Sequence, residues 1–139
     1  ETGSITGLYS VLVEGDDFNE PVSDTVRGLL DGHVMLSRDL ASQNHFPAVD
    51  IQDSISRLMV HITDPEHQAA AGKIRDLMAT YRKSEDLINI GAYAHGTNVK
   101  IDKAIQMKDE IDAFLRQSIS ERVEFSDTIQ QLQAIAARI

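Results

Sequence analysis

Residues 63–81 read TDPEHQAAAGKIRDLMATY, and their pattern indicates how this chain is organised. Thr63 and Glu66 have the spacing of a capping box, and Pro65 falls in the first turn, where a missing N–H costs no helical hydrogen bond. Apolar side chains then recur at helical spacing at Ile74, Leu77, Met78 and Tyr81. The stretch therefore predicts an amphipathic helix with one face in a core.

Helical spacing continues to the end of the chain. The first helix keeps its register from Ser84 to Ile90 and is expected to stop at Gly91. Beyond the loop 92–98, apolar residues with the same spacing are Ile101, Ala104, Ile105, Ile111, Phe114, Leu115, Ile129, Leu132, Ile135 and Ile139. Residues 59–139 are therefore expected to form an all-α helical bundle domain.

The N-terminal part has a different pattern, in which short apolar runs alternate with turn formers. Ile5–Val13 is rich in β-branched and aromatic residues, which favours a strand buried on both faces of a parallel sheet. Ser23 or Asp24 is expected to cap a helix that ends near Gly32, and Val34–Leu36 to form a second strand. Strand, helix and strand in this order predict an α/β sheet.

Two strands leave such a sheet incomplete. We expect its other strands upstream of Glu1, because the chain enters the first apolar run without an initiating methionine and looks like an excised piece. The boundary is expected near Leu58. The prediction is thus a partial α/β domain at residues 1–58 and a helical domain at residues 59–139, with the chain as a whole mostly helical.

Composition narrows the classes of function. A formal net charge of −9 and a pI near 4.8 argue against nucleic-acid binding, which needs a concentrated basic surface. The absence of cysteine excludes disulfides and zinc-thiolate sites, and the histidines lack metal-ligand spacing, so no metal site is predicted. No apolar run approaches the roughly 20 residues of a spanning helix, so a cytoplasmic protein is expected.

Unusual motifs follow one another along the chain. They are GSIT at 3–6, GDDFNEP at 15–21, LDGHVMLSR at 30–38, FPAVD at 46–50, SISR at 54–57 and LINIG at 87–91. In this order they resemble the hexameric RecA-like ATPases of flagellar and type III protein export, which are related to the catalytic subunits of rotary ATP synthases. The resemblance covers essentially the whole chain and implies that the N-terminal part is the distal portion of a RecA-like P-loop NTPase domain.

Arg57 is the first candidate that the resemblance supplies. In the family, the arginine at the end of the Ser-x-Ser-Arg segment is a finger that enters the neighbouring subunit's nucleotide site and stabilises charge on the transferred γ-phosphoryl group. Arginine suits this role because its planar, permanently charged fork can contact two phosphate oxygens. Without the motif, Arg57 would be interpreted as a surface residue that starts a helix.

The resemblance also implies an adenine-binding side. Phe46 takes the place of an aromatic that stacks on the base, with Pro47 beneath it, and Phe125 matches a second aromatic. Ile119 stands where rotary synthases have another aromatic, which predicts a looser base pocket. The alternative is that either phenylalanine belongs to the core.

Two loops correspond to contacts with a central stalk. Asp16 and Asp17 lie in a loop that faces the central pore in the family, although a solvated turn would explain them equally simply. Tyr93 and His95 lie in the loop 92–98, at the position of the acidic lever loop of rotary synthases. This loop is not acidic here, which argues for an export ATPase over a rotary subunit.

The sequence contains no Gly-x-x-x-x-Gly-Lys-Ser/Thr motif to cradle phosphates. The resemblance places the P-loop and the Mg²⁺ ligands upstream, so the intact enzyme is expected to use ATP and Mg²⁺ and this chain alone to be inactive.

The intact protein is expected to be a cytoplasmic homohexamer that couples ATP hydrolysis to protein export, docked at the inner face of the cell membrane. The partners that the resemblance implies are a coiled-coil stalk protein, a regulator, export chaperones and substrates, and the membrane export gate. Two alternatives stay open: a fragment of a rotary ATP synthase catalytic subunit, and a stand-alone acidic helical interaction module.

Overall fold

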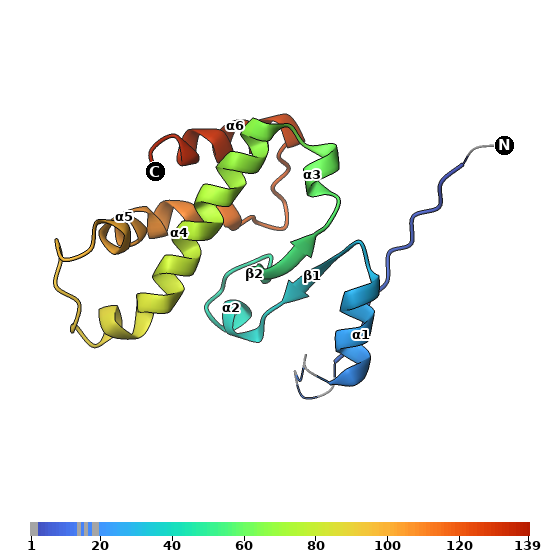
Figure 1. The fold of residues 1–139 in the computed structure, drawn as a ribbon, viewed down its shortest axis with the longest axis horizontal. Coiled ribbons are helices and arrows are strands. Elements are labelled where there is room, and N and C mark those ends of the chain that lie inside the picture. The colour runs from blue at the N-terminus through green and yellow to red at the C-terminus, as the bar shows by residue number, and fades with distance from the viewer. Residues whose placement is uncertain (1–2, 14, 16, 18–19) are drawn as a thin grey trace. The chain divides into compact units, whose positions relative to one another are not determined.

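The computed structural model describes residues 3–13, 15, 17 and 20–139. The chain folds as two compact units, Glu1–Leu30 and Asp31–Ile139. The elements along it are α1 (Pro21–Leu29), β1 (Gly32–Leu36), α2 (Arg38–Ser42), β2 (Val49–Ser56), α3 (Met59–Ile62), α4 (Pro65–Asn89), α5 (Val99–Leu115) and α6 (Phe125–Ala136). Helices therefore predominate in the described part, together with a two-stranded sheet (Figure 1).

The first unit contains helix α1. Glu20 is extended at the N-cap position and Pro21 is the first helical residue, where proline has no N–H to leave unpaired. The hydroxyl of Ser23 donates a hydrogen bond to the Glu20 carboxylate at 2.9 Å. The helix and its end near Gly32 are confirmed, but the expected cap at Ser23 or Asp24 is wrong because proline sets the start earlier.

Residues 3–13 form no strand. The side chains of Ile5, Leu8 and Leu12 are almost wholly exposed. A strand must pair its backbone N–H and C=O groups with a neighbour, and the described strands pair only with each other. The expectation of a buried strand at Ile5–Val13 is therefore wrong for this structure.

The sheet of the second unit is antiparallel. Strand β1 contains the predicted Val34–Leu36 and pairs with β2, which the sequence reasoning did not anticipate. The predicted parallel pair joined a strand at Ile5–Val13 to one at Val34–Leu36, but residues 3–13 form no strand and β1 pairs with β2 instead. The expected parallel βαβ arrangement is consequently wrong.

The second unit also contains the short helices α2 and α3 and the longer helices α4, α5 and α6. Helix α4 packs against both α5 and α6 (Figure 1). Asp64 is its N-cap and accepts a hydrogen bond from the His67 N–H at 2.7 Å, so the capping residue is one later than the expected Thr63. Gly91 follows the helix with a φ of 70°, a conformation that favours glycine, as expected for its end.

The core lies between these three helices. The buried apolar residues from α4, α5 and α6 are Ala70, Ile74, Leu77, Ala104, Met107, Ile111, Leu132, Ile135 and Ala136. The predicted residues Ile74, Leu77, Ala104, Ile111, Leu132 and Ile135 are among them, while Met78, Tyr81, Phe114, Leu115 and Ile139 are partly buried against the cluster. Burying one such large aliphatic side chain contributes about 1.5–3 kcal/mol, so the helical packing dominates the stability of this unit.

Within the described residues, none of the helices combines the length and apolar character needed to cross a lipid bilayer.

Candidate functional site

Arg57 lies directly after β2. The last residue of the strand, Ser56, pairs with Gly32 of β1, and the backbone N–H of Arg57 donates to the Asp31 carbonyl at 2.8 Å. The side chain of Arg57 is exposed. The permanently charged guanidinium of Arg57 thus projects from the connection between β2 and α3, at the end of a paired strand. Arg57 itself does not start a helix.

The ladder between the strands is interrupted at residues 51–54, two paired residues before Arg57. Met35 pairs with Asp50 and His33 pairs with Ile55, so residues 51–54 of β2 face the single residue Val34 of β1. This excess of residues on one strand is a β-bulge, a feature that often re-aims a side chain beside a functional site.

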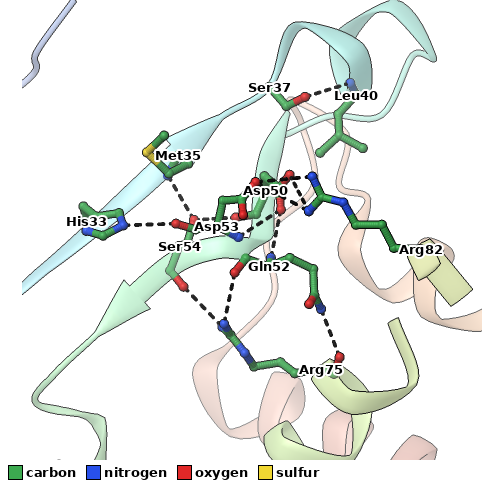
Figure 2. Close-up of polar contacts among 10 residues, drawn as sticks. All are labelled: His33, Met35, Ser37, Leu40, Asp50, Gln52, Asp53, Ser54, Arg75 and Arg82. Atoms are coloured by element: carbon green, nitrogen blue, oxygen red, sulfur yellow. Dashed lines mark hydrogen bonds and ion pairs between the residues drawn. The ribbon is translucent and has the colours of Figure 1, made fainter. Parts of the chain in front are cut away.

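Side chains of β2 itself hold the bulge together (Figure 2). Asp50 Oδ1 accepts hydrogen bonds from the backbone N–H groups of Gln52 at 2.8 Å and Asp53 at 3.1 Å. Ser54 Oγ donates to the Asp50 carbonyl at 2.6 Å and accepts from the Met35 N–H at 2.9 Å. The hydroxyl of Ser54, the first serine of the Ser-x-Ser-Arg segment, therefore takes the place of a backbone hydrogen bond that the ladder lacks at this point.

Helix α4 also binds the bulge. Arg75 donates from Nη1 to the Ser54 carbonyl and from Nη2 to the Gln52 carbonyl, each at 3.3 Å, and Gln52 Nε2 donates back to the Arg75 carbonyl at 3.0 Å. Arg82, one heptad further on, pairs with Asp50 at 3.6 Å and with Asp53 at 3.4 Å. The sequence reasoning missed both arginines, although their spacing of seven puts them on one face of a helix.

The predicted adenine-side residues are exposed. Phe46 is joined to Pro47 by a cis peptide bond and retains 49% of its surface accessibility. Its carbonyl accepts a hydrogen bond from the Gln117 N–H at 2.8 Å, which brings it to the segment that carries Ile119. Ile119 is fully exposed. The core alternative is wrong for Phe46, and the two segments expected to share a base pocket are in contact.

Phe125 is placed differently. It is the first residue of α6 and is 73% exposed, so it is not a core residue either. Its ring lies 6.4 Å from that of His67, tilted by 58°. This ring contact places Phe125 against α4.

His45 is a buried residue that no local pattern in the sequence distinguishes. It precedes Phe46, is 5% exposed, and its backbone N–H donates to the Leu40 carbonyl at 2.9 Å. Burial lowers the pKa of His45 below its ordinary value of 6.5, and the positive charge of Arg116 lowers it further, against the opposing effect of Asp112. The neutral imidazole is thus the form that fits the fold.

We expect the stability of this chain to fall as the pH drops below about 6.5. Because the pKa of His45 is lower in the folded state, the unfolded chain binds a proton first, so this stabilisation is complete above pH 6.5 and is lost on acidification toward the folded-state pKa. Urea unfolding of His45→Gln should depend less on pH than that of the parent chain. His61→Gln at an exposed position is the control, and an equal change in both variants would contradict the assignment.

The loop between α4 and α5 is organised around Asp102. The Tyr93 hydroxyl lies 2.9 Å from Asp102 Oδ1 and accepts from the Asn98 N–H at 3.2 Å. The Gly96 N–H also donates to the Asp102 carboxylate, at 3.0 Å. The His95 side chain is 86% exposed, with Nε2 3.8 Å from the same carboxylate. Tyr93 is therefore bound within the loop, whereas His95 is presented to solvent.

Of the two predicted pore residues, one is described. Asp17 is exposed and its carbonyl accepts from the Glu20 N–H at 3.2 Å. Asp16 lies outside the described residues. Within the described part of the chain, no three His, Asp or Glu side chains gather as possible ligands of a metal ion.

Comparison with known proteins adds to this geometry. Residues 63–134 match the family model described as the T3SS EscN ATPase C-terminal domain, and residues 1–56 match the nucleotide-binding domain of the ATP synthase alpha/beta family. A protein named flagellum-specific ATP synthase from Bacillus subtilis is 50% identical over 97% of this chain and 31% of its own length. A type 3 secretion system ATPase from Pseudomonas savastanoi is 45% identical over all of this chain and 31% of its own.

Two solved structures are similar over most of the chain. The assembled ATPase EscN from enteropathogenic E. coli superposes with a TM-score of 0.90 at 44% identity, covering 96% of this chain and 32% of that one. EscN in complex with its central stalk EscO gives a TM-score of 0.78 at 42% identity, covering 84% and 29%. The chain thus spans about a third of the length of its relatives.

The match to the Pseudomonas savastanoi protein covers the whole chain, including Phe46, Arg57 and the helical core. We conclude that this chain belongs to the family of type III secretion and flagellar ATPases.

Proposed function

We propose that this chain supplies the trans-acting half of an ATP site in a ring-shaped ATPase that drives flagellar or type III protein export. The observation that carries the proposal is the exposed Arg57, held at the end of a braced strand in a chain of this family. Its guanidinium would enter the site of the neighbouring subunit and stabilise charge that develops on the γ-phosphoryl group.

The adenine side of the site is assigned to Phe46, Pro47, Ile119 and Phe125. Phe46 and Ile119 are exposed, and the Phe46 carbonyl accepts a hydrogen bond from the segment that holds Ile119, so both side chains are available to a ligand. Stacking of a base on an aromatic ring contributes about 1–3 kcal/mol and tolerates any base, so these residues would add affinity more than selectivity.

The rest of the site lies outside this chain. The proposal assigns the P-loop and the Mg²⁺ ligands to upstream residues of a RecA-like domain, whose distal part is residues 1–58, with residues 59–139 as the helical domain. The change from one family model to the other between residues 56 and 63 supports this division. When bound, Mg²⁺ would neutralise phosphate charge.

A homohexamer is the assembly that the proposal requires. EscN, similar over 96% of this chain, is described as an assembled ATPase, and it is also known in complex with its central stalk EscO. By analogy, Asp16, Asp17, Tyr93 and His95 are proposed to face a coiled-coil stalk, and the side chain of His95 is 86% exposed.

The remaining partners are a regulator, export chaperones and substrates, and a membrane export gate at which the cytoplasmic ring docks. This proposal is preferred to a rotary ATP synthase subunit because the loop 92–98 contains no acidic residue.

A mixed-ring experiment tests the proposal. Full-length subunits with Arg57→Ala and full-length subunits in which the P-loop lysine is replaced should each hydrolyse ATP poorly alone. Mixed together, they should recover part of the activity, because some interfaces then combine an intact P-loop with an intact Arg57 from the neighbour. A steady-state ATPase assay at several mixing ratios measures this, and no recovery at any ratio would contradict a finger supplied in trans.

A further inference from the structure

We infer that Arg75 is a positioning residue for Arg57 and that it links the helical bundle to the ATP site. The inference rests on the proposed role of Arg57 as an arginine finger. It follows from the way in which α4 holds the bulge at residues 51–54, which two paired residues separate from Arg57 (Figure 2).

The bulge leaves backbone carbonyls without partners in the ladder. Residues 51–54 have one facing residue on β1, so ordinary strand pairing cannot satisfy all of their groups. Instead, the carbonyls of Gln52 and Ser54 accept from Arg75, and that of Asp53 accepts from His33 Nε2 at 3.0 Å. Side chains thus satisfy three consecutive carbonyls.

The two ends of the guanidinium fork fix more than one point of the strand. One amino group binds at Gln52 and the other at Ser54, so the fork restrains both the position and the direction of the chain as it leaves the bulge. Gln52 Nε2 donates in return to the Arg75 carbonyl, which fastens the strand to the α4 backbone. A lysine could make only a point contact here.

Arg57 is held from two sides as a result. On the β1 side, Ser56 pairs with Gly32 and the Arg57 N–H donates to the Asp31 carbonyl. On the α4 side, Arg75 holds Ser54, three residues before the finger. Removing the α4 side leaves the approach of the strand to Arg57 defined by β1 alone.

The same helix connects this point to the bundle and to the loop with His95. Ile74 and Leu77, which flank Arg75 on α4, are in the core with α5 and α6. A displacement of the bundle would therefore move Arg75 and, through it, the end of β2. Arg82 also binds the bulge through its ion pairs with Asp50 and Asp53. Because Arg82 is exposed, each pair contributes only about 0–1 kcal/mol.

The test compares variants of the full-length enzyme. Arg75→Ala should lower kcat by about 10²-fold, the effect of misplacing a catalytic group by roughly 1 Å, while KM for ATP and the affinity for ADP change less than about twofold. Binding of ADP with aluminium fluoride, which mimics the transferring phosphoryl group, should weaken in parallel with kcat. Arg75→Lys should be intermediate.

Lys83→Ala is the matched control, because it removes one exposed positive charge from the same helix. It should leave kcat, KM for ATP, and the binding of ADP with and without aluminium fluoride unchanged. Thermal unfolding separates positioning from loss of folded protein. If Arg75→Ala lowered only the melting temperature, and kcat per folded subunit matched that of Lys83→Ala, the inference would be wrong.

Arg57→Ala in the same assays separates this inference from the proposed function. An impaired Arg57→Ala beside an unimpaired Arg75→Ala overturns the positioning role and leaves the finger standing. An unimpaired Arg57→Ala overturns both.

Discussion

Replacing Arg57 by alanine in the full-length protein is expected to lower kcat by a factor of about 10³ to 10⁵ while ATP binding is retained. The guanidinium acts on charge that appears only as the phosphoryl group is transferred, so its loss raises the barrier without weakening the ground-state complex. The expected loss corresponds to about 4–7 kcal/mol of transition-state stabilisation. Steady-state ATPase kinetics together with equilibrium binding of a fluorescent ATP analogue measure the two quantities separately.

The conservative variant Arg57→Lys sharpens this test. A lysine keeps the charge but contacts phosphate at a single point, so it should recover little of the lost rate. A wild-type kcat for Arg57→Ala would contradict the finger assignment, and full recovery with lysine would contradict the requirement for a fork.

Replacing Gly32 by alanine is expected to destabilise the second unit by about 1–3 kcal/mol, the usual cost of forcing an extra carbon into a packed site. A Cβ at this position would lie 2.7 Å from the Ile55 carbonyl oxygen and 3.3 Å from the Ser56 Cα, and both are backbone atoms of β2. The strand that leads to Arg57 must therefore shift. Urea unfolding followed by circular dichroism measures the stability, and the kcat of the full-length variant should fall as well.

Gly72→Ala is the matched control for this substitution. Nothing lies within 4 Å of a Cβ built on Gly72, which is inside α4. Alanine should raise stability there by about 0.5–1 kcal/mol, since glycine is a poor residue in a helix interior. If the two variants shifted the unfolding transition in the same direction, the close approach at Gly32 would not be the cause.

The helical half of the fold could be predicted because its signals are local. The stripe through Ile74 and Leu77, the proline that opens α4 and the glycine that follows it each act within a few residues. The sheet could not be predicted in the same way. Strand β2 reads VDIQDSIS, and its pairing depends on β1, about 20 residues away, and on a bulge that no alternation of side chains reveals.

The apolar run at Ile5–Val13 shows the opposite error. Its composition suits a buried strand, but burial requires neighbours, and the described residues provide none. The composition of the run therefore indicates that it can form a strand within a larger sheet, but among the described residues it forms none.

The candidate site was predicted only in part. Arg57, Phe46 and Ile119 were found through resemblance, and their exposure is consistent with contacts to a ligand. Arg75 and His45 were missed because their roles depend on partners more than 20 residues away along the chain. Such contacts are set by packing, and the spacing of Arg75 and Arg82 indicates a shared helix face but not the strand that it binds.

The central claim is that Arg57 of one protomer reaches a phosphate held by the next. The most direct measurement is a structure of the assembled full-length ring with ADP, Mg²⁺ and aluminium fluoride bound. We expect the Arg57 guanidinium to lie within about 3 Å of the fluoride group in the adjoining protomer's site. An assembled ring in which that side chain extends into solvent, away from every nucleotide, would contradict it.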